Sequence, residues 1–207
     1  MNKRPLLIAH RGDPAHAPEN TVASFRSAIA KGARSVEMDV RRLADGAWVV
    51  RHDPYRGRSN GFLPAAEALR FCRSRRARVF LDVKTPAAER ELAALIRRSG
   101  WGAQVSVLAG TYPSLKRWRR LLPGRPVFWV TGYRQGVTRE RVARAAGLKL
   151  DGFVAYKGKV DRSALERTHR AGMELYIWTV RTRAELRRFS RLGVDGMMNE
   201  LWPAPSI

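Results

Sequence analysis

Segments that read as strands alternate with segments that read as helices along the whole chain, and this alternation restricts the fold more than any other feature. Eight runs rich in β-branched and other apolar residues indicate strands: 6–11, 35–41 (with a short extension at 47–51), 78–84, 104–109, 126–131, 151–156, 174–180 and 195–199. Seven runs with helical periodicity separate them: 20–31, 64–74, 87–98, 112–121, 138–146, 161–171 and 182–191. Such alternation is typical of βαβ units on a parallel sheet, and eight strands predict a closed (β/α)₈ TIM barrel.

The ends of the elements also carry signals. We expect Asn20 to cap the first helix, and Thr182-x-x-Glu185 reads as a capping box for the last one. The 207 residues, 44% of them hydrophobic, predict a single barrel domain over 1–207. Prolines in the final segment 201–207 exclude a regular helix there, so the eighth outer helix should be missing. Trp202, the tail or a second subunit would then have to cover apolar surface, and a homodimer is a reasonable expectation.

Carboxylates cluster on two of the expected strands. Glu37 and Asp39 share one face because side chains on a strand alternate with period two. Two neighbouring carboxylates repel unless a cation or a proton lies between them, and oxygen ligands suit a hard cation such as Mg²⁺ or Ca²⁺. A solvated polar face is the alternative. Asp82 adds a third carboxylate with Lys84 beside it, and a structural salt bridge is the alternative there.

Two histidine motifs follow strands as well. His10-Arg11-Gly12 comes at the end of the first strand, and His52-Asp53 follows the extension of the second. Barrel enzymes place their sites where the carboxyl ends of the strands meet. Two histidines, an arginine and several carboxylates at one such end could bind a metal, hold a phosphate and move protons.

Ten short motifs spread over nearly the whole chain resemble one known family, the glycerophosphodiester phosphodiesterases. They are His10-Arg11-Gly12, Pro18-Glu19-Asn20-Thr21, Gly32-Ala33, Glu37-x-Asp39-Val40, Asp45-Gly46, Val49-Val50, His52-Asp53, Asp82-x-Lys84, Trp178-Thr179-Val180 and Gly193-Val194-Asp195-Gly196. The resemblance implies a TIM-barrel enzyme that hydrolyses glycerophosphodiesters to glycerol 3-phosphate and an alcohol. It also implies that His10 and His52 are the acid/base pair and that Arg11 and Lys84 bind the phosphate.

By the same resemblance, Glu37, Asp39 and Asp82 bind one divalent cation, Mg²⁺ or Ca²⁺, with Mn²⁺ as an alternative. We expect Trp178 to pack on the glycerol or alcohol part of the substrate, with a plain core tryptophan as the alternative. Either water or the 2-hydroxyl of the substrate could be the nucleophile. Either histidine could be the acid.

The chain departs from the family pattern at three places, and these departures bear on which substrate it accepts. Many members carry an extended insertion after the second strand, where this chain has only the short loop 54–63. Position 82 is Asp where most members have Glu, and Arg181 stands where Asn is usual. A lysophospholipase D-like enzyme acting on lipid substrates is therefore the alternative activity, and a non-catalytic barrel that binds polyanions is the third hypothesis.

The net charge of +22, from 40 basic and 18 acidic residues, bears on partners rather than on the fold. Six bases follow strands and should rim the mouth of the barrel: Arg56, Arg58, Arg134, Lys157, Lys159 and Arg181. Six aromatic residues should accompany them: Tyr55, Phe62, Tyr112, Tyr133, Tyr156 and Trp202. Such a rim suits a small-molecule or lysolipid phosphodiester and peripheral contact with an anionic membrane. Nucleic acid would also suit it, but the chain has no nucleic-acid-binding motif, so we do not expect that partner.

We expect a cytoplasmic enzyme. No apolar stretch is long enough to cross a bilayer, and the first ten residues lead into a strand without the pattern of a signal peptide. Cys72 is the only cysteine, which excludes an intrachain disulfide. His16 is expected in a solvated loop, with substrate contact as the alternative, and His169 on the outer surface.

Overall fold

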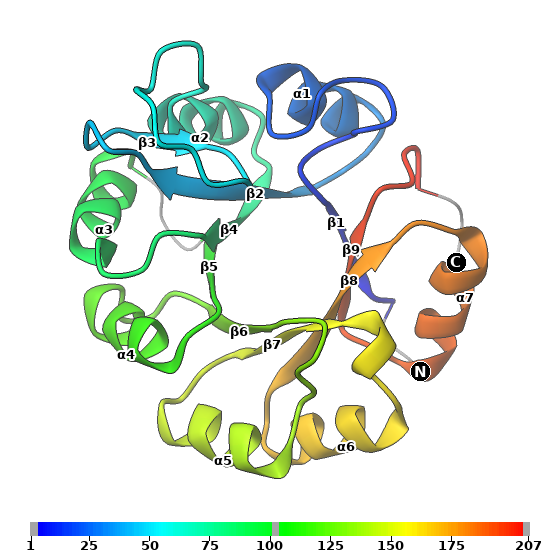
Figure 1. Ribbon diagram of the computed structural model, residues 1–207. Coiled ribbons are helices and arrows are strands. Elements are labelled where there is room, and N and C mark those ends of the chain that lie inside the picture. Colours follow the sequence, from blue (N-terminus) through cyan, green and yellow to red (C-terminus); the bar gives the residue numbers. More distant parts are fainter. Residues whose placement is uncertain (1–3, 101–103, 205–207) are drawn as a thin grey trace.

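The computed structural model describes residues 4–100 and 104–204, which form a closed barrel of parallel strands surrounded by helices (Figure 1). The barrel order is β1-β2-β4-β5-β6-β7-β8-β9, and it closes because β9 pairs with β1. The strands are β1 (Leu6–Ala9), β2 (Ser35–Arg42), β3 (Trp48–Val50), β4 (Arg78–Val83), β5 (Val105–Ala109), β6 (Val127–Thr131), β7 (Gly152–Tyr156), β8 (Glu174–Val180) and β9 (Gly196–Asn199). The TIM barrel predicted from the sequence is confirmed.

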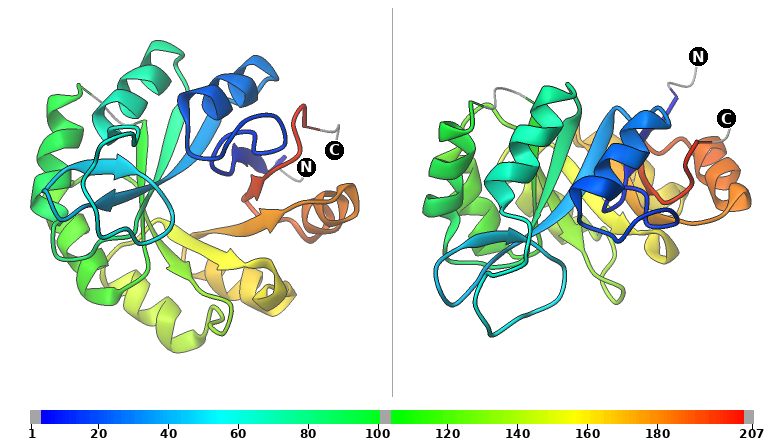
Figure 2. Two further views of the ribbon diagram at one scale, coloured as in Figure 1. Left: turned by 45° about the horizontal axis from the view of Figure 1, so that its top comes forward. Right: turned by 90° about the horizontal axis from the view of Figure 1, so that it is seen from above.

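Seven α-helices lie outside the barrel in the described ranges, each crossing back between successive barrel strands (Figures 1 and 2). They are α1 (Val22–Ala30), α2 (Ala65–Ser74), α3 (Glu89–Arg98), α4 (Tyr112–Leu121), α5 (Arg139–Gly147), α6 (Arg162–Arg170) and α7 (Arg183–Leu192). A short 3₁₀ helix, η1 (Lys157–Lys159), follows β7. Among the described residues, none of these helices has both the length and the apolar character of a bilayer span.

The segment near residues 47–51 is not an extension of the second strand. It forms β3, which pairs antiparallel with β2 in the register Val40 to Val50 and therefore lies outside the barrel closure. The chain then continues in the loop 51–64, which projects beyond the end of the barrel (Figure 2). This short loop stands where the family that the sequence motifs resemble commonly has a longer insertion.

Strand alternation separates two cores. The outward side chains of the strands pack with the helices, while a second cluster fills the barrel: Ile8, Phe80, Leu108, Phe128, Val154, Tyr176 and Met198. Each barrel strand except β2 contributes one residue to this inner layer. At the matching register position opposite Phe80, β2 presents Glu37. The carboxylate therefore stands beside an apolar layer, which is a costly place for a charge.

No helix follows β9 up to Ala204, the last described residue, as the prolines predict. The indole of Trp202 is buried in the outer core instead and donates from Nε1 to the carbonyl of Asn199 at 3.1 Å. Of the three covers expected for this side of the barrel, the structure shows Trp202 and, from the tail, Ala204, which also packs against the outer core. The homodimer stays a prediction.

The predicted cap of the first helix is wrong. Thr21, not Asn20, is the N-cap residue of α1, and its hydroxyl accepts from the amide of Ser24 at 3.2 Å. At α7 the hydroxyl of Thr182 does accept from the Glu185 amide, at 3.1 Å. The Glu185 carboxylate, however, accepts from the Arg181 amide instead of closing the box on Thr182.

Candidate active site

Three carboxylates from two neighbouring strands meet at the carboxyl end of the barrel. Asp39 and Asp82 stand side by side because β2 and β4 pair in parallel at that position, and Glu37 lies two residues earlier on the same face. One oxygen from each of the three lies within 4.8 Å of the others. Glu37 and Asp39 are 2% and 1% exposed, so the alternative of a solvated strand face is wrong.

Two cationic side chains lie against this cluster. Lys84 Nζ is 2.6 Å from Asp82 Oδ2 and 3.0 Å from Asp39 Oδ1, so a salt bridge of Asp82 is indeed present. Arg11 donates its amide to Glu37 Oε2 at 3.0 Å and its Nη1 to Glu19 at 2.8 Å. Arg11 Nε lies 3.0 Å from Asp39 Oδ2 without hydrogen-bond geometry, and this buried donor has no acceptor among the described residues.

The three carboxylates of the cluster differ in how well nearby cations offset their burial. Burial, together with the charges of Asp39 and Asp82, raises the pKa of Glu37 well above its usual range. Burial likewise raises the pKa of Asp82, although Lys84 opposes it. For Asp39, burial is outweighed by Lys84 and Arg11, and its pKa is lowered. With all three carboxylates ionised, the site would carry more negative charge than Lys84 and Arg11 neutralise, which is the electrostatic setting of a cation site.

Asn20 holds the central carboxylate of the cluster. Its side-chain amide donates to Asp39 Oδ2 at 2.9 Å, while its side-chain oxygen accepts from the Asp39 amide at 3.2 Å. Its backbone has a φ of 60°, which asparagine tolerates better than most residues. The residue expected to cap a helix thus positions Asp39 instead.

The turn after β1 is fixed by close packing on α1. Gly12 has a φ of 91°, and a Cβ there would lie 2.3 Å from Ser24 Oγ, so only glycine fits. That hydroxyl donates to the Arg11 carbonyl at 3.0 Å and accepts from the Asp13 amide at 2.7 Å. Asp13 is fully buried and binds Lys31 Nζ at 2.7 Å. The position of His10 and Arg11 is therefore set by α1.

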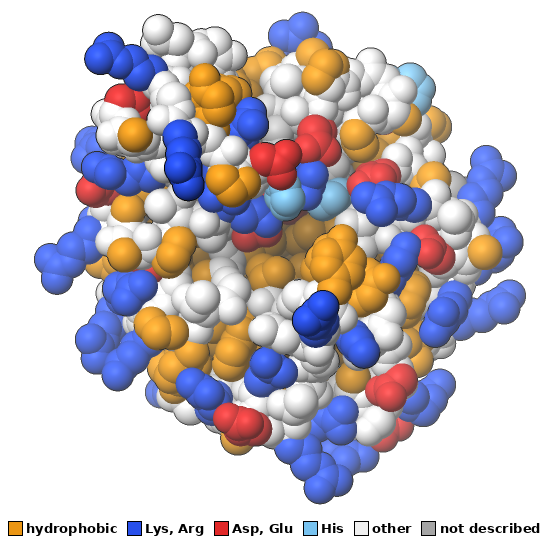
Figure 3. All heavy atoms as spheres, in the orientation of Figure 1, with side chains coloured by type: hydrophobic (Ala, Val, Ile, Leu, Met, Phe, Trp, Pro, Cys, Tyr) orange, Lys and Arg blue, Asp and Glu red, His pale blue; other side chains and the backbone are white. Residues whose placement is uncertain are grey.

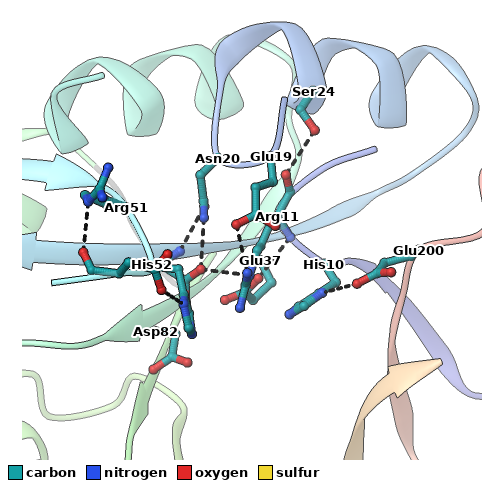
Figure 4. A network of polar contacts seen from close by, with 12 residues as sticks. His10, Arg11, Glu19, Asn20, Ser24, Glu37, Arg51, His52, Asp82 and Glu200 are labelled. Carbon is teal, nitrogen blue, oxygen red and sulfur yellow. Dashed lines mark hydrogen bonds and ion pairs between the residues drawn. The ribbon is translucent and has the colours of Figure 1, made fainter. Parts of the chain in front are cut away.

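The two histidines approach from opposite sides of Glu37 (Figure 4). His10 Nδ1 lies 2.8 Å from Glu200 Oε1, and His52 Nδ1 lies 2.8 Å from Asp53 Oδ1. An ionised carboxylate can only accept a hydrogen bond, so each Nδ1 carries a proton and each Nε2 is left for a reacting group. The surroundings differ, since the His10 side chain is 9% exposed and that of His52 39%.

Glu200 is a residue of the site that sequence reasoning missed. It follows β9, 190 residues after His10, and binds Arg181 through both oxygens, with Oε2 to Nε at 2.7 Å and Oε1 to Nη2 at 3.1 Å. Burial would raise the pKa of Glu200, but the hydrogen bonds from His10 and Arg181 outweigh it and lower the pKa to about 2. Its position just after the last strand could have identified it, because barrel enzymes place their sites at the carboxyl ends of the strands.

Trp178 lies between the inner core and the mouth. It packs at the edge of the inner apolar cluster and donates from Nε1 to the Thr131 carbonyl at 3.2 Å. Its ring contacts Tyr133 and Tyr156, with centroids 4.9 and 5.5 Å apart. Both roles expected of Trp178, packing on a substrate and packing in the core, are compatible with this place.

The expected rim is present in part. Lys157 binds Glu185 at 2.5 Å and Arg181 binds Glu200, so these two bases are internally paired. Two aromatic residues do not belong to the rim. Trp202 is buried in the outer core, and Tyr112 packs against that core beneath Arg144, whose guanidinium is 4.1 Å from its ring centre. The short 54–63 loop and the exposed Tyr133 do lie at the mouth.

The remaining histidines lie outside the cluster. His16 is 55% exposed at its side chain and binds Asp13 at 3.0 Å, which supports the solvated-loop expectation. His169 binds Asp195, whose position before β9 is at the opposite end of the barrel, at 2.8 Å. Neither contacts a carboxylate of the cluster.

Two cavities bracket the barrel. One of about 250 Å³ lies beside His52, between Glu19 and Phe62 beneath the projecting loop. A larger one of about 640 Å³ opens at the opposite end, around Arg78, Glu174 and other residues at the strand starts. The larger cavity contains none of the candidate site residues, so size does not identify the reactive end here.

The donor set at the reactive end fits a divalent metal. All the converging ligands are carboxylate oxygens, the atoms that Mg²⁺ and Ca²⁺ prefer. The pKa of buried Glu37 is raised because Lys84 and Arg11 only partly offset its burial and the charges of Asp39 and Asp82. The unsatisfied Nε of Arg11 adds a donor suited to a phosphate oxygen next to that position.

The chain is similar to known proteins over nearly its whole length. The chain matches the Glycerophosphoryl diester phosphodiesterase family over residues 10–61 and 76–200, which include every candidate site residue named above. It is 24% identical over 230 residues to a glycerophosphodiester phosphodiesterase of Caldanaerobacter subterraneus, covering 94% of this chain and 93% of that protein.

Solved structures share the fold. A phosphodiesterase of Oleispira antarctica, in complex with the product sn-glycerol-3-phosphate, superposes with a TM-score of 0.83 at 21% identity, covering 97% of this chain and 94% of that one. A glycerophosphodiester phosphodiesterase of Parabacteroides distasonis gives 0.81 at 20% identity, with coverage of 97% and 94%.

Proposed function

The chain belongs to the glycerophosphoryl diester phosphodiesterase family, and we propose that it hydrolyses glycerophosphodiesters to glycerol 3-phosphate and an alcohol with the help of one divalent cation. The observation that carries this proposal is the juxtaposition at one barrel end of three converging carboxylates and two carboxylate-bound histidines. A barrel that only bound polyanions would have no use for buried acids at the centre of its basic surface.

Glu37, Asp39 and Asp82 would hold the cation. When bound, a divalent cation supplies a Lewis acid that withdraws charge from phosphoryl oxygens. Mg²⁺, Ca²⁺ and Mn²⁺ all accept such oxygen ligands. Lys84 holds Asp39 and Asp82 in place through its two short contacts and favours their ionised forms.

Arg11 would bind the phosphate. Its Nε–H is buried and has no acceptor in the described structure, so a phosphoryl oxygen would complete its hydrogen bonding. Because Arg11 is tied to Glu37 through its amide and to Glu19 through Nη1, the guanidinium is held before substrate arrives. Such preorganised donors stabilise charge that grows in the transition state.

The two imidazoles would move the protons. One takes a proton from the nucleophile, which is water or the 2-hydroxyl of the substrate, and the other donates a proton to the leaving oxygen. The Nδ1 contacts with Glu200 and Asp53 fix each ring so that Nε2 does this work. The carboxylate partners also stabilise whichever imidazole becomes charged.

The test is to follow glycerophosphocholine by phosphorus NMR with Mg²⁺, Ca²⁺, Mn²⁺ or chelator present. The expected products are glycerol 3-phosphate and choline. A transient cyclic phosphate would identify the 2-hydroxyl as the nucleophile. Release of phosphocholine and glycerol, or no turnover with any of the metals, would overturn the proposal.

A lipid diester is the second candidate substrate. The observation that favours it is the short 51–64 connection, which leaves Tyr55 44% exposed at the mouth instead of covering it with a longer insertion. An open mouth admits a long alkyl chain. Lysophosphatidylcholine in the same assay, with choline release as readout, separates this candidate from the soluble diester.

A further inference from the structure

We propose that the reactive end of the barrel docks on an anionic lipid surface, using a set of four cations and two tyrosines that we call the docking rim: Arg56, Arg58, Arg134, Lys159, Tyr55 and Tyr133. The usefulness of docking rests on the proposed function, since docking would bring the site to a lipid diester. The binding itself follows from the surface.

The exposed aromatic residues gather at this end. Among the described residues, Tyr55 and Tyr133 are the large hydrophobic side chains that solvent reaches most, at 44% and 64% exposure. Both lie on loops that follow strands, Tyr55 after β3 and Tyr133 after the barrel strand β6. Tyrosine is favoured where lipid headgroups meet the apolar layer because its ring is apolar and its hydroxyl is polar.

Both rings are held by neighbours. Tyr55 packs edge-on against Phe62 at 4.9 Å, and the guanidinium of Arg51 lies within 5.2 Å of both ring centres. Tyr133 packs edge-on against Tyr156 at 4.6 Å and Trp178 at 4.9 Å. Since the rings are already ordered, little side-chain freedom would be lost on insertion.

The four cations of the rim have no carboxylate partner in the described structure, and all are exposed. They lie around the mouth on the loops after β3 and β6 and at the end of η1, which follows β7. Figure 3 looks onto this end, where Lys and Arg side chains are spread around the hollow in which the histidines lie, with acidic and apolar side chains between them. Exposed cations without internal partners are free to approach lipid phosphates.

Most acids of the same end have a side-chain partner, but Asp45 and Asp161 accept from backbone amides and have no ion pair in the described structure. Glu19 binds Arg11, Asp53 binds His52, Glu185 binds Lys157, and Glu200 binds both His10 and Arg181. The buried carboxylates of Glu37 and Asp39 do not reach the surface. The four rim cations outnumber Asp45, Asp53 and Asp161, the exposed acids without a Lys or Arg partner, so the outward charge of this end is positive, which suits an anionic surface and not a zwitterionic one.

The other end of the molecule supplies a matched control. Arg98, Arg120, Lys149 and Arg191 are exposed and have no ion pair among the described residues. They lie at or just after the C-terminal ends of α3, α4, α5 and α7, which is away from the mouth. Changing these four to Gln removes the same charge and the same residue types as changing the four rim cations.

The experiment is co-sedimentation with vesicles of phosphatidylcholine, with and without phosphatidylserine, at low and high salt. We expect binding only with phosphatidylserine, and release by salt because ions screen surface charge. Each rim base contributes roughly fivefold to partition. The rim quadruple Gln variant should therefore lose roughly several hundredfold in partition, and the control variant much less. The double variant Tyr55→Ser/Tyr133→Ser should bind more weakly than the wild type. The loss relative to the wild type should be larger at high salt than at low salt, because charge dominates binding at low salt.

Equal losses in the two quadruple variants would overturn the proposal, because total charge would then explain binding. Absence of wild-type binding at low salt would overturn it as well. Hydrolysis of soluble glycerophosphocholine separates this outcome from the proposed function, since the rim quadruple variant should keep that activity. Vesicle binding without any diester hydrolysis would leave the docking rim standing and reject the proposed activity.

Discussion

Glu200 Oε1 lies 2.8 Å from His10 Nδ1, although 190 residues separate the two in the chain. The contact exists because β1 and β9 pair side by side where the barrel closes. It links the first histidine motif to Arg181, one of two residues that depart from the family pattern, through a single carboxylate.

Glu200→Ala should lower kcat by roughly tenfold to a hundredfold with a smaller change in KM, because the residue orients His10 and does not touch substrate. Glu200→Gln, whose amide oxygen can still accept from Nδ1, should lose less. The measurement is steady-state kinetics as a function of pH. Loss of the Glu200 charge should shift the limb of the pH–rate profile that His10 sets, whether that limb is the acidic or the basic one. An unchanged pH profile in Glu200→Ala would contradict this role.

The same carboxylate makes a pH-dependent contribution to stability. Because the folded pKa is lowered to about 2, below the ordinary value of 4.5, the stabilisation is complete above pH 4.5 and lost as pH falls towards 2. Thermal unfolding of wild type and Glu200→Gln should therefore differ most near neutral pH and converge in acid. If the difference in melting temperature between wild type and Glu200→Gln grew in acid, the assigned direction of the Glu200 pKa shift would be wrong.

Asn20 and Thr21 are neighbours with different predicted roles. Asn20→Gly keeps the left-handed backbone but removes both contacts with Asp39, so metal affinity should fall by roughly tenfold or more, a usual effect of losing a partner that orients a ligand. Thr21→Ala removes the cap of α1 and should cost about 1 kcal/mol of stability with little effect on metal affinity. Calorimetric metal titration and urea unfolding distinguish the two, and identical behaviour would mean that Asn20 serves only the local fold.

Chelator should abolish hydrolysis, and Mg²⁺, Ca²⁺ or Mn²⁺ should restore it. Added metal should also raise the melting temperature of the wild type, because a ligand that binds only the folded state stabilises it. Asp82→Asn should weaken both effects. Full turnover by protein shown to be metal-free by elemental analysis would rule out the cation site.

His10→Ala and His52→Ala should each reduce turnover by roughly a hundredfold or more, the usual size of a lost acid/base contribution. His169→Ala is the control, because His169 binds Asp195 at the far end of the barrel. That variant should keep full activity. The proton-transfer assignment fails if His52→Ala turns over at the wild-type rate.

Trp202→Ala should cost roughly 3–5 kcal/mol, because it leaves a cavity in the outer core where no eighth helix stands among the described residues. Tyr55→Ala, at an exposed aromatic residue, is the comparison and should cost much less. Urea denaturation measures both. Equal small losses would mean that Trp202 does not close this side of the barrel.

Much of the architecture could be predicted because it depends on local pattern. The strand and helix segments agree with the observed elements to within about two residues at most ends, since periodicity of two or 3.6 is written in neighbouring residues. The shared face of Glu37 and Asp39 follows from the same rule. The segment at 47–51 was assigned wrongly because its alternation cannot tell whether a strand continues its neighbour or folds back on it.

By itself, then, the sequence determined the order of the elements, the family motifs and the residue types gathered after the strands. Only the tertiary structure decided what those residues contact. Asn20 binds Asp39 instead of a helix end, Glu200 meets His10, and Trp202 fills the place of a helix. Each of these contacts joins segments that closure of the barrel brings together, and no local periodicity records which strand ends will be neighbours in space.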